Sequence, residues 1–342
     1  MKIKKEVTIY DLAKELNLST STISRALKGH RSISEKTTLE VKKCAKRMGY
    51  RPNSLAASLR NNKSKTIGIM ISRINRPFVS SLITGIEESA RNAGYNVIIS
   101  QSNDIYNNEV SNTKALYDSR ISGLVVSLAM ETKKLNHFQQ FLDSGIPVVF
   151  VDRVPEKLEA YRVIIDNYSA GYKATQHLIE QGCKRIAHFA GAQHLNVYHD
   201  RKRGYLDALI DNKIPIDKKL IKNFSSLSFE EGEKAANKLL DMPNPPDGLF
   251  SANDTAAVSA IMCAKKRGLK IPEDLAIIGF NDDPLASIVQ PALSTIFHPA
   301  IEMGKISAEK ILEHLQNFKK NTAQLTVLDT ELIIRDSSNR QK

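Results

Sequence analysis

A short polar run early in the chain carries side chains that could bind nucleic acid. Small hydroxyl residues are followed one helical turn later by an arginine, in the order Thr20, Ser21, Thr22, Ser24 and Arg25. Hydroxyl groups can approach base edges and phosphates, and a guanidinium binds either, so this layout is typical of a recognition helix in the DNA major groove. The alternative is a surface helix with solvated serines, because helix-turn-helix geometry also occurs in proteins that bind no DNA.

The distribution of charge favours the nucleic-acid interpretation. Residues 1–65 hold sixteen Lys or Arg against five Asp or Glu, a net charge of +11, whereas the whole chain of 342 residues carries +12. A basic surface confined to one small module is typical of phosphate binding, since a generally basic protein would spread its charge. A membrane surface could attract the same charge, but no amphipathic helix with a bulky apolar face accompanies it.

Three short helices are expected to position the polar run. Thr8 is a good N-cap for the first, and Asp11 three residues later can complete a capping box. Apolar side chains recur along one face of this helix, at Ile9, Leu12, Ala13 and Leu16. Ser19 then caps the second helix, which carries the polar run itself.

The third helix is expected to begin after Ser34 and to end at Gly49. Its apolar positions have helical spacing, at Val41, Cys44, Ala45 and Met48. Residues 53–60 could form a further two-turn helix, but a helix of that length is marginal in water and should be ordered only against a partner. A linker is expected to follow, up to residue 66.

The rest of the chain alternates short β-branched runs with helical stretches. Strands are expected at residues 66–71, 95–100, 123–127, 147–151, 185–189, 248–251 and 275–280, with a late strand near 329–334. Continuous apolar strands separated by single helices indicate parallel strands that are buried on both faces. The predicted fold class is therefore α/β, a helix-turn-helix head followed by two doubly wound parallel-sheet subdomains. A ligand cleft is expected between them, beyond the carboxyl ends of the strands.

Several other protein classes lack support in the sequence. No apolar run approaches the length of a membrane span, and no signal-peptide apolar region follows the N-terminus, so a cytoplasmic protein is expected. The three cysteines have no metal-ligand spacing: Cys44, Cys183 and Cys263. Phosphate-binding Gly-rich loops, nucleophile elbows and His-Glu-x-x-His motifs are absent, so we expect neither an enzyme nor a metal or cofactor.

Five stretches resemble, in order, the head and hinge of the lactose-repressor (LacI/GalR) family of bacterial transcription regulators: Thr8–Leu27, Ser32–Thr37, Gly49–Asn53, Leu55–Ala56 and Ser58–Leu59. Ala57 departs from the resemblance, because the family often has Arg there. The resemblance implies that Thr20 and Ser21 read bases and that Arg25 contacts a base or phosphate. It also implies that Leu59 wedges into the minor groove. The other DNA-binding residues expected from it are Thr8, Thr22, Ser24, Tyr50, Asn53, Ala56 and Arg60.

The body resembles the effector domain of the same family, which shares its fold with periplasmic sugar-binding proteins. The resemblance implies that Phe78 stacks on a sugar ring and that Arg201 and Asn253 bind hydroxyls. Asn281 stands where the family commonly has Asp, so it would keep the contact only as an amide. The remaining expected effector-binding residues are Arg76, Asp104 and His298.

Two of the nearby positions have a structural alternative. His298 could equally be a crossover or core histidine. Asp254 is expected to hold the turn between a strand and a helix rather than to touch the ligand.

These observations together predict a homodimeric regulator of transcription, expected to be a repressor, that binds a palindromic operator in double-stranded DNA. A dimer is expected because one short helix reads only a few base pairs, whereas two heads on a symmetric body read both half-sites. The expected effector is a small polar metabolite, a sugar or sugar derivative, with a purine-type ligand as the alternative. A sugar-binding transport receptor is a weaker alternative, because the basic head argues against it.

The expected domain limits follow from the same patterns. The head with its hinge should occupy residues 1–60, and the effector-binding and dimerisation domain residues 61–342. Within the body, one subdomain is expected from residues 66–151 plus 297–325, and the other from 152–290 plus 326–342. The protein is expected in the bacterial cytoplasm, associated with the nucleoid.

Overall fold

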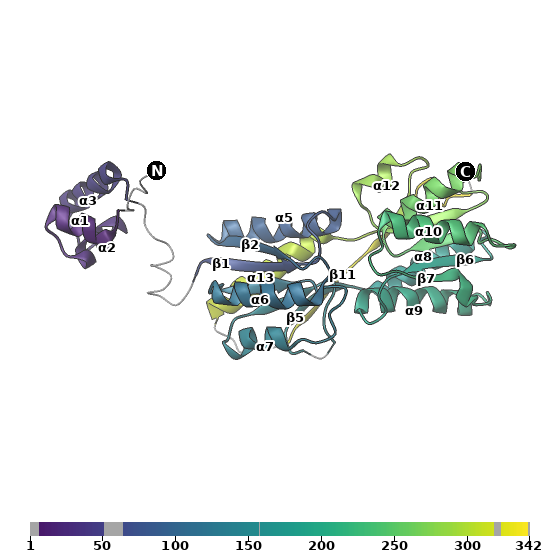
Figure 1. Ribbon diagram of the computed structural model, residues 1–342, viewed down its shortest axis with the longest axis horizontal. Coiled ribbons are helices and arrows are strands. Elements are labelled where there is room, and N and C mark those ends of the chain that lie inside the picture. The colour runs from purple at the N-terminus through teal and green to yellow at the C-terminus, as the bar shows by residue number, and fades with distance from the viewer. Residues whose placement is uncertain (1–6, 51–63, 157, 318–322, 341–342) are drawn as a thin grey trace. The chain divides into compact units, whose positions relative to one another are not determined.

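The computed structural model describes residues 7–50, 64–156, 158–317 and 323–340. The chain divides into two compact units, one ending at Ser64 and the other beginning at Lys65 (Figure 1). The predicted hinge helix lies outside the described residues. The DNA contacts predicted for Asn53, Ala56, Leu59 and Arg60 therefore stay predictions.

The first unit is a bundle of three helices in its described part, α1 (Ile9–Leu16), α2 (Thr20–Leu27) and α3 (Glu35–Met48). The predicted caps are present. The Thr8 amide donates to the Asp11 carboxylate over 2.7 Å. The hydroxyls of Ser19 and Ser34 each accept a hydrogen bond from an amide of the helix that follows. One small apolar core joins the three helices, made of Leu12, Ile23, Ala26, Val41, Cys44 and Ala45.

The second unit contains two lobes, each built on a six-stranded sheet. In lobe 1 all paired strands are parallel, in the order β11-β5-β4-β3-β1-β2. These strands are β1 (Thr66–Ile71), β2 (Asn96–Gln101), β3 (Gly123–Val126), β4 (Val148–Val151), β5 (Tyr161–Ile165) and β11 (Leu325–Leu328). Helices cover both faces of the sheet, namely α5 (Pro77–Asn92), α6 (Tyr106–Asp118), α7 (Asn136–Asp143) and α13 (Ala300–Asn317).

Lobe 2 repeats this architecture in the order β12-β10-β9-β8-β6-β7, with β12 antiparallel to its neighbour. Its strands are β6 (Ile186–Ala190), β7 (Ile221–Asn223), β8 (Gly248–Ser251), β9 (Ala276–Asn281), β10 (Ser294–Phe297) and β12 (Glu331–Ile333). Its helices are α8 (Asn167–Glu180), α9 (Asn196–Asp211), α10 (Phe229–Leu240), α11 (Asp254–Lys266) and the short α12 (Pro284–Ile288), with one 3-10 turn, Lys218–Leu220. The predicted pair of doubly wound parallel sheets is confirmed.

The predicted division between the lobes was wrong in two places. We expected residues 152–290 and 326–342 in the second lobe, but β5 pairs with β4 and β11 pairs with β5 in the first sheet. β5 contains a charged residue, and β11 is an exposed edge strand. Neither therefore shows the continuous apolar run of a central strand. The short strand β7 was missed for the same reason, and β10 was also not among the expected strands.

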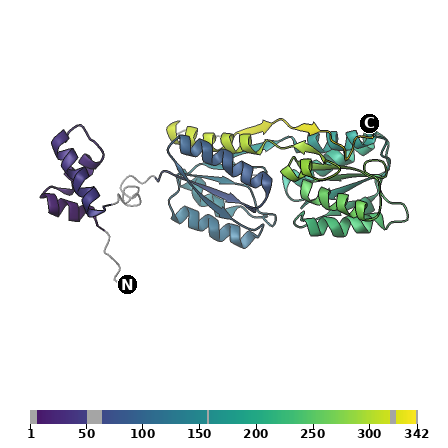
Figure 2. The same ribbon diagram turned by 90° about the horizontal axis from the view of Figure 1, so that it is seen from above.

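The chain passes between the lobes at three places within the described residues. The first crossing follows Ile165, the second lies between β10 and α13, and the third joins β11 to β12. Figure 2 shows the C-terminal segments running along one side of both lobes. Connections of this kind are typical of two-lobed proteins that close around a ligand.

None of the helices in the described ranges is both long and apolar enough to span a bilayer. Among the same residues, no cluster of three or more His, Cys, Asp or Glu side chains is arranged to hold a metal ion. The three cysteines, Cys44, Cys183 and Cys263, are free and buried.

Candidate functional site

The polar run on α2 lies on the outer face of the head. Ile23 and Ala26 are fully buried in the head core, so the side chains around them point outward. Arg25 is exposed, and its guanidinium makes no hydrogen bond or ion pair with another described residue of the head. The five predicted DNA-binding residues of this helix are all exposed or half-buried: Thr20, Ser21, Thr22, Ser24 and Arg25. The head therefore presents these polar groups to solvent, as a recognition helix requires.

Some of the predicted DNA-binding residues also serve the head itself. The hydroxyls of Ser21 and Thr22 lie 2.7 and 2.8 Å from the hydroxyl of the capping Ser19. Thr8 takes part in the cap of α1, and the ring of Tyr50 packs against the head core. These contacts fix the start of each helix, and the contribution of each side chain to DNA binding stays a prediction.

A cavity lies between the two lobes of the body, where the carboxyl ends of their strands meet. The empty space between its walls amounts to about 640 Å³ when the part open to solvent is counted. Residues that follow β1, β2 and β4 line it from lobe 1, and residues that follow β8 and β9 line it from lobe 2. This is the place at which a doubly wound sheet binds ligands. Six of the seven predicted effector residues line it: Arg76, Phe78, Asp104, Arg201, Asn253 and Asn281.

His298 is the predicted effector residue that does not line this cavity. It is 3% exposed and lies at the second crossing, with its ring stacked on Phe78 at 4.1 Å between centroids. Its Nδ1 lies 3.3 Å from Oδ1 of Asn281. Burial lowers its pKa well below the usual value, so the ring is neutral. This position fits the alternative, a crossover histidine that supports two residues of the cavity wall.

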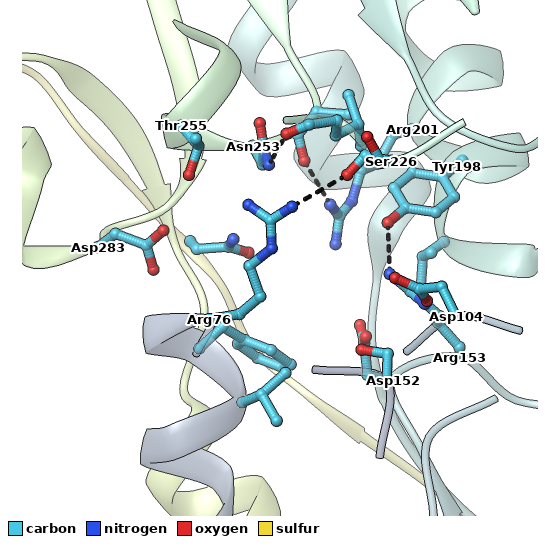
Figure 3. Close-up of a pocket in the computed structure, with 17 residues that line it drawn as sticks. Arg76, Asp104, Asp152, Arg153, Tyr198, Arg201, Ser226, Asn253, Thr255 and Asp283 are labelled. Carbon is cyan, nitrogen blue, oxygen red and sulfur yellow. Dashed lines mark hydrogen bonds and ion pairs between the residues drawn. The ribbon is translucent and has the colours of Figure 1, made fainter. Parts of the chain in front are cut away.

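Arg201 is held rigidly at the back of the cavity. Its side chain is buried, with Nε donating to Oδ1 of Asn167 over 2.8 Å and Nη1 donating to the carbonyl of Ala252 over 2.9 Å. Its guanidinium carbon lies 3.4 Å from the ring centroid of Phe280. Burial lowers its pKa to about 10, so the group stays charged at neutral pH. Nη2 makes no hydrogen bond to the described residues, so it is available to a ligand (Figure 3).

Asp104 is the centre of a charged group on the lobe 1 side. Its carboxylate accepts from Nη1 of Arg153 at 2.6 Å, from Nε of Arg73 at 3.2 Å and from the amide of Met130 at 3.1 Å. Burial would raise its pKa, but the charge and hydrogen bond of Arg153 and the Met130 amide outweigh burial and lower it. Arg153 also donates to the Tyr198 hydroxyl in lobe 2 over 3.0 Å. The carboxylate thus orients an arginine that reaches across the cleft.

Two other carboxyl groups face the cavity without an arginine in direct contact. Burial raises the pKa of Asp152, and the charge of Arg201 opposes this effect. Burial also raises the pKa of Asp283, to about 6, against the charge of Arg76. A carboxyl in this position can accept hydrogen bonds from ligand hydroxyls or, when protonated, donate one.

Asp254 has a structural role, as predicted, but it holds the turn after β9, whereas Asn253 caps the helix α11 at which Asp254 lies. Asp254 is fully buried, with Oδ1 accepting from the Thr295 hydroxyl and Oδ2 from the Asp283 amide, both over 2.7 Å. It does not line the cavity. The turn after β9, which carries Asn281 and Asp283 into the cavity, is therefore fixed by this carboxyl.

Further residues also line the cavity. Asp152, Arg153 and Asp283 lie in the stretches after strands where ligand contacts were expected, whereas Tyr198, Ser226 and Thr255 were not predicted. Tyr198 precedes Arg201 by three residues on α9, so helical spacing alone could have indicated that both face the same way. Ser226 could not be found in this manner, because it follows the short strand β7 that the sequence did not reveal. Asp152, Arg153 and Asp283 follow strands, but nothing local distinguishes them from their neighbours.

Comparison with known proteins identifies two regions of the chain. Residues 8–53 match the family of bacterial regulatory proteins, lacI family, and residues 175–338 match the periplasmic binding protein-like domain. The HTH-type transcriptional repressor CytR of Escherichia coli (strain K12) is 35% identical over 342 residues, covering 99% of each chain. The chain belongs to the lacI family. Another lacI-like relative, the ribose operon repressor of Haemophilus influenzae, is 31% identical over 96% of this chain and 98% of its own length.

Solved structures show the same fold. The lac repressor dimer bound to operator and the anti-inducer ONPF has a TM-score of 0.85 at 22% identity, covering 98% of this chain and 99% of the other. The transcriptional regulator CelR–cellobiose complex has a TM-score of 0.72 at 26% identity, covering 97% and 100%. This lacI-family chain is a DNA-binding transcription regulator and not an enzyme.

Proposed function

We propose that this lacI-family regulator binds a palindromic operator in DNA as a homodimer and represses transcription. It acts in the bacterial cytoplasm. A sugar or sugar derivative bound in the cleft controls its operator affinity. The observation that carries the proposal is the cavity between the lobes, which Arg201, Asn253 and Asn281 line together with Phe78.

The chemistry of these groups suits a polyhydroxylated ligand. A guanidinium and two side-chain amides are planar and can pair with adjacent hydroxyls, while an aromatic ring covers the apolar face of a sugar. The carboxyl groups of Asp152 and Asp283 add acceptors for ligand hydroxyls. A purine-type ligand is the second candidate, because Phe78 would stack on a flat base and Arg201 would donate to its acceptors.

The named relatives support a carbohydrate. One is a ribose operon repressor, and one similar solved structure contains cellobiose. Both share the fold of this chain over nearly its whole length. Because specificity within one fold is set by a few cavity residues, these names support the chemical class of the effector rather than its identity.

An exposed apolar edge supports the homodimer. β2 is an edge strand of lobe 1, and its Ile98 and Ile99 are 42% and 40% exposed. Neighbouring loops add Ile74 at 47% and Ile105 at 43%. An apolar edge strand left uncovered invites aggregation, and a second copy of the chain packed on it by a two-fold axis would bury it.

The experiment that tests the proposal combines ligand screening with operator binding. Purified protein is screened by thermal shift against sugars, sugar acids, phosphosugars and purines, and each hit is then titrated into an operator-binding assay. A ligand at 100 times its Kd should stabilise the protein by about 2.7 kcal/mol, a clear shift in Tm. We expect a sugar-class hit that changes operator affinity at least several-fold.

Other outcomes have definite meanings. Stabilisation by purines alone would replace the sugar with the second candidate. A sugar that stabilises the body and leaves operator affinity unchanged would contradict effector control.

A further inference from the structure

One side chain bridges the cleft from the start of α5. Arg76 belongs to lobe 1, and its Nη2 donates to the backbone carbonyl of Ser226 in lobe 2 over 3.2 Å (Figure 3). The two residues are 150 positions apart in the chain. Both line the cavity, so this bond passes through the space that the proposed effector would enter.

The local sequence places the Arg76 side chain in this direction. Pro77 is the first residue of α5, and a residue before proline is restricted to extended backbone. Arg76 accordingly has φ −93° and ψ 127°, which turns it away from the helix axis. Its carbonyl accepts from the Ser80 amide over 2.9 Å, so the backbone from which the guanidinium projects is fixed.

The acceptor in lobe 2 is held just as firmly. The carboxylate of Glu231 accepts from both the amide and the hydroxyl of Ser225 and of Ser226. These bonds lower the pKa of Glu231 to about 2 although burial opposes them. The Leu227 carbonyl that follows accepts from the Asn253 side chain over 2.9 Å. The turn that carries the Ser226 carbonyl is therefore constrained on both sides.

Charge adds a longer-range attraction across the same gap. Arg76 forms no ion pair within the described residues, yet its charge opposes the rise in the pKa of Asp283. The pKa of Glu230 is lowered by hydrogen bonds from its own amide and from Ser228, and the charge of Arg76 adds to this effect. Both acids belong to lobe 2. A cation on one lobe thus faces carboxyl groups on the other, in addition to its directed hydrogen bond.

We propose that Arg76 clamps the two lobes together through the Ser226 carbonyl, and that Glu231 is the positioning residue that presents this carbonyl. The clamp extends the proposed function, because breaking it would be required for an effector to enter the cavity. Closure of the lobes then depends on the chain's own side chains as well as on the ligand.

The test measures lobe separation in the full-length protein without DNA or effector. Dyes are attached to cysteines introduced at exposed positions of the two lobes, Lys134→Cys and Lys234→Cys. The native cysteines are buried and should not be labelled. The distance between the dyes is then measured by single-molecule FRET in molecules with one labelled protomer. Arg76→Met should shift the distribution to longer distances. Arg91→Met is the matched control, because Arg91 on the same helix bonds Glu87 within lobe 1.

The variant Glu231→Gln distinguishes the positioning of the Ser226 carbonyl from the direct contact that Arg76 makes with it. It should open the lobes and also speed amide hydrogen exchange at Ser225 and Ser226 by roughly tenfold, because their amides lose a charged acceptor. Arg76→Met should open the lobes without changing exchange at those two amides. The double variant should be no more open than Arg76→Met alone, since Glu231 acts through Arg76.

Two results would overturn the clamp. Equal distance distributions for Arg76→Met and Arg91→Met would show that the bond does not hold the lobes. Additional opening by Glu231→Gln in the Arg76→Met background would show that Glu231 acts elsewhere. The proposed function is tested separately, by ligand titrations on the unsubstituted protein. If Arg76→Met opens the lobes and no ligand alters the operator affinity of the unsubstituted protein, the clamp stands and effector control fails.

Discussion

Arg201 shows how a buried charge can be prepared for a ligand. Two of its nitrogens bond Asn167 and Ala252, its flat face lies on Phe280, and one nitrogen is left for the cavity. Such a group keeps its orientation whether or not a ligand is bound, so little conformational entropy is lost on binding.

Replacing Arg201 should remove the ligand response and spare DNA binding. In Arg201→Ala, affinity for the effector found by screening should fall roughly 100-fold, since a charged hydrogen bond and its fixed geometry are lost. Operator affinity without effector should change little. Isothermal titration and operator titration measure the two quantities, with Arg203→Ala, an exposed arginine on the same helix, as control. Loss of operator binding in a folded Arg201→Ala protein would contradict this separation.

Asp254 makes stability depend on pH. Burial raises its pKa to about 7 from an ordinary value of 3.8. The folded protein therefore retains this proton to higher pH than the unfolded chain does. The contribution of this proton to the free energy of unfolding is complete below about pH 4 and is lost as pH rises through about 7.

Asp254→Asn should accordingly flatten the pH profile of stability. The slope of the unfolding free energy between pH 5 and pH 7 should become less negative, by up to about 1.4 kcal/mol per pH unit. Denaturant melts at several pH values measure this slope. Asp118→Asn, a surface carboxyl paired with Lys114, is the control and should leave it unchanged. An unaltered slope in Asp254→Asn would mean that this carboxyl is already ionised in the folded protein at pH 5.

At the scale of elements, glycines bring pairs of helices into close contact. A Cβ on Gly171 of α8 would collide with the Arg201 carbonyl of α9, and one on Gly204 of α9 would collide with the Tyr168 carbonyl of α8. Lobe 1 has the same arrangement between α5 and α13, through Gly85 and Gly304. In lobe 2 this contact sets the position of the helix that carries Arg201.

Gly171→Ala should therefore affect both stability and ligand binding. The added methyl must push α9 outward, which should cost about 1–3 kcal/mol of unfolding free energy and misplace Arg201. Denaturant melts and effector titration test the two effects, with Lys173→Ala on the exposed side of the same helix as control. Reduced stability with normal effector affinity would show that α9 adjusts without moving its arginine.

For the whole molecule, the central question is how one short recognition helix achieves specificity. Two heads joined by a symmetric body can read two half-sites, and this requires a dimer. The exposed isoleucines of β2 are the surface at which we expect the bodies to meet.

Ile99→Asp should therefore separate the subunits. A charge in an apolar interface is costly, so the variant should sediment as a monomer at micromolar concentration and bind a palindromic operator roughly 100-fold more weakly. Binding to a single half-site should change little. Ile210→Asp, the same change at an isoleucine that is 57% exposed at the end of α9, is the control. A dimeric Ile99→Asp protein would place the interface elsewhere.

Much of this organisation could be predicted from local sequence patterns. The caps of the head helices, the buried face of α2 and the alternation of strands and helices each depend on neighbours within a few residues. Central strands such as β3 and β4 were recognised because they are buried on both faces and read as continuous apolar runs. Six cavity residues were named because the resemblance to the lacI family implies them, and the cavity itself was expected where the strands end.

The sequence by itself therefore determined the class of fold, the DNA-binding head and the general place of the cleft. Tertiary structure alone decided the lobe to which β5 and β11 belong, the placement of His298 behind Phe78, and the bond from Arg76 to Ser226. Edge strands lack a strong apolar pattern, and contacts across the cleft join residues far apart in the chain. Local periodicity reports burial, whereas the partner of a polar side chain is known only once the chain has folded.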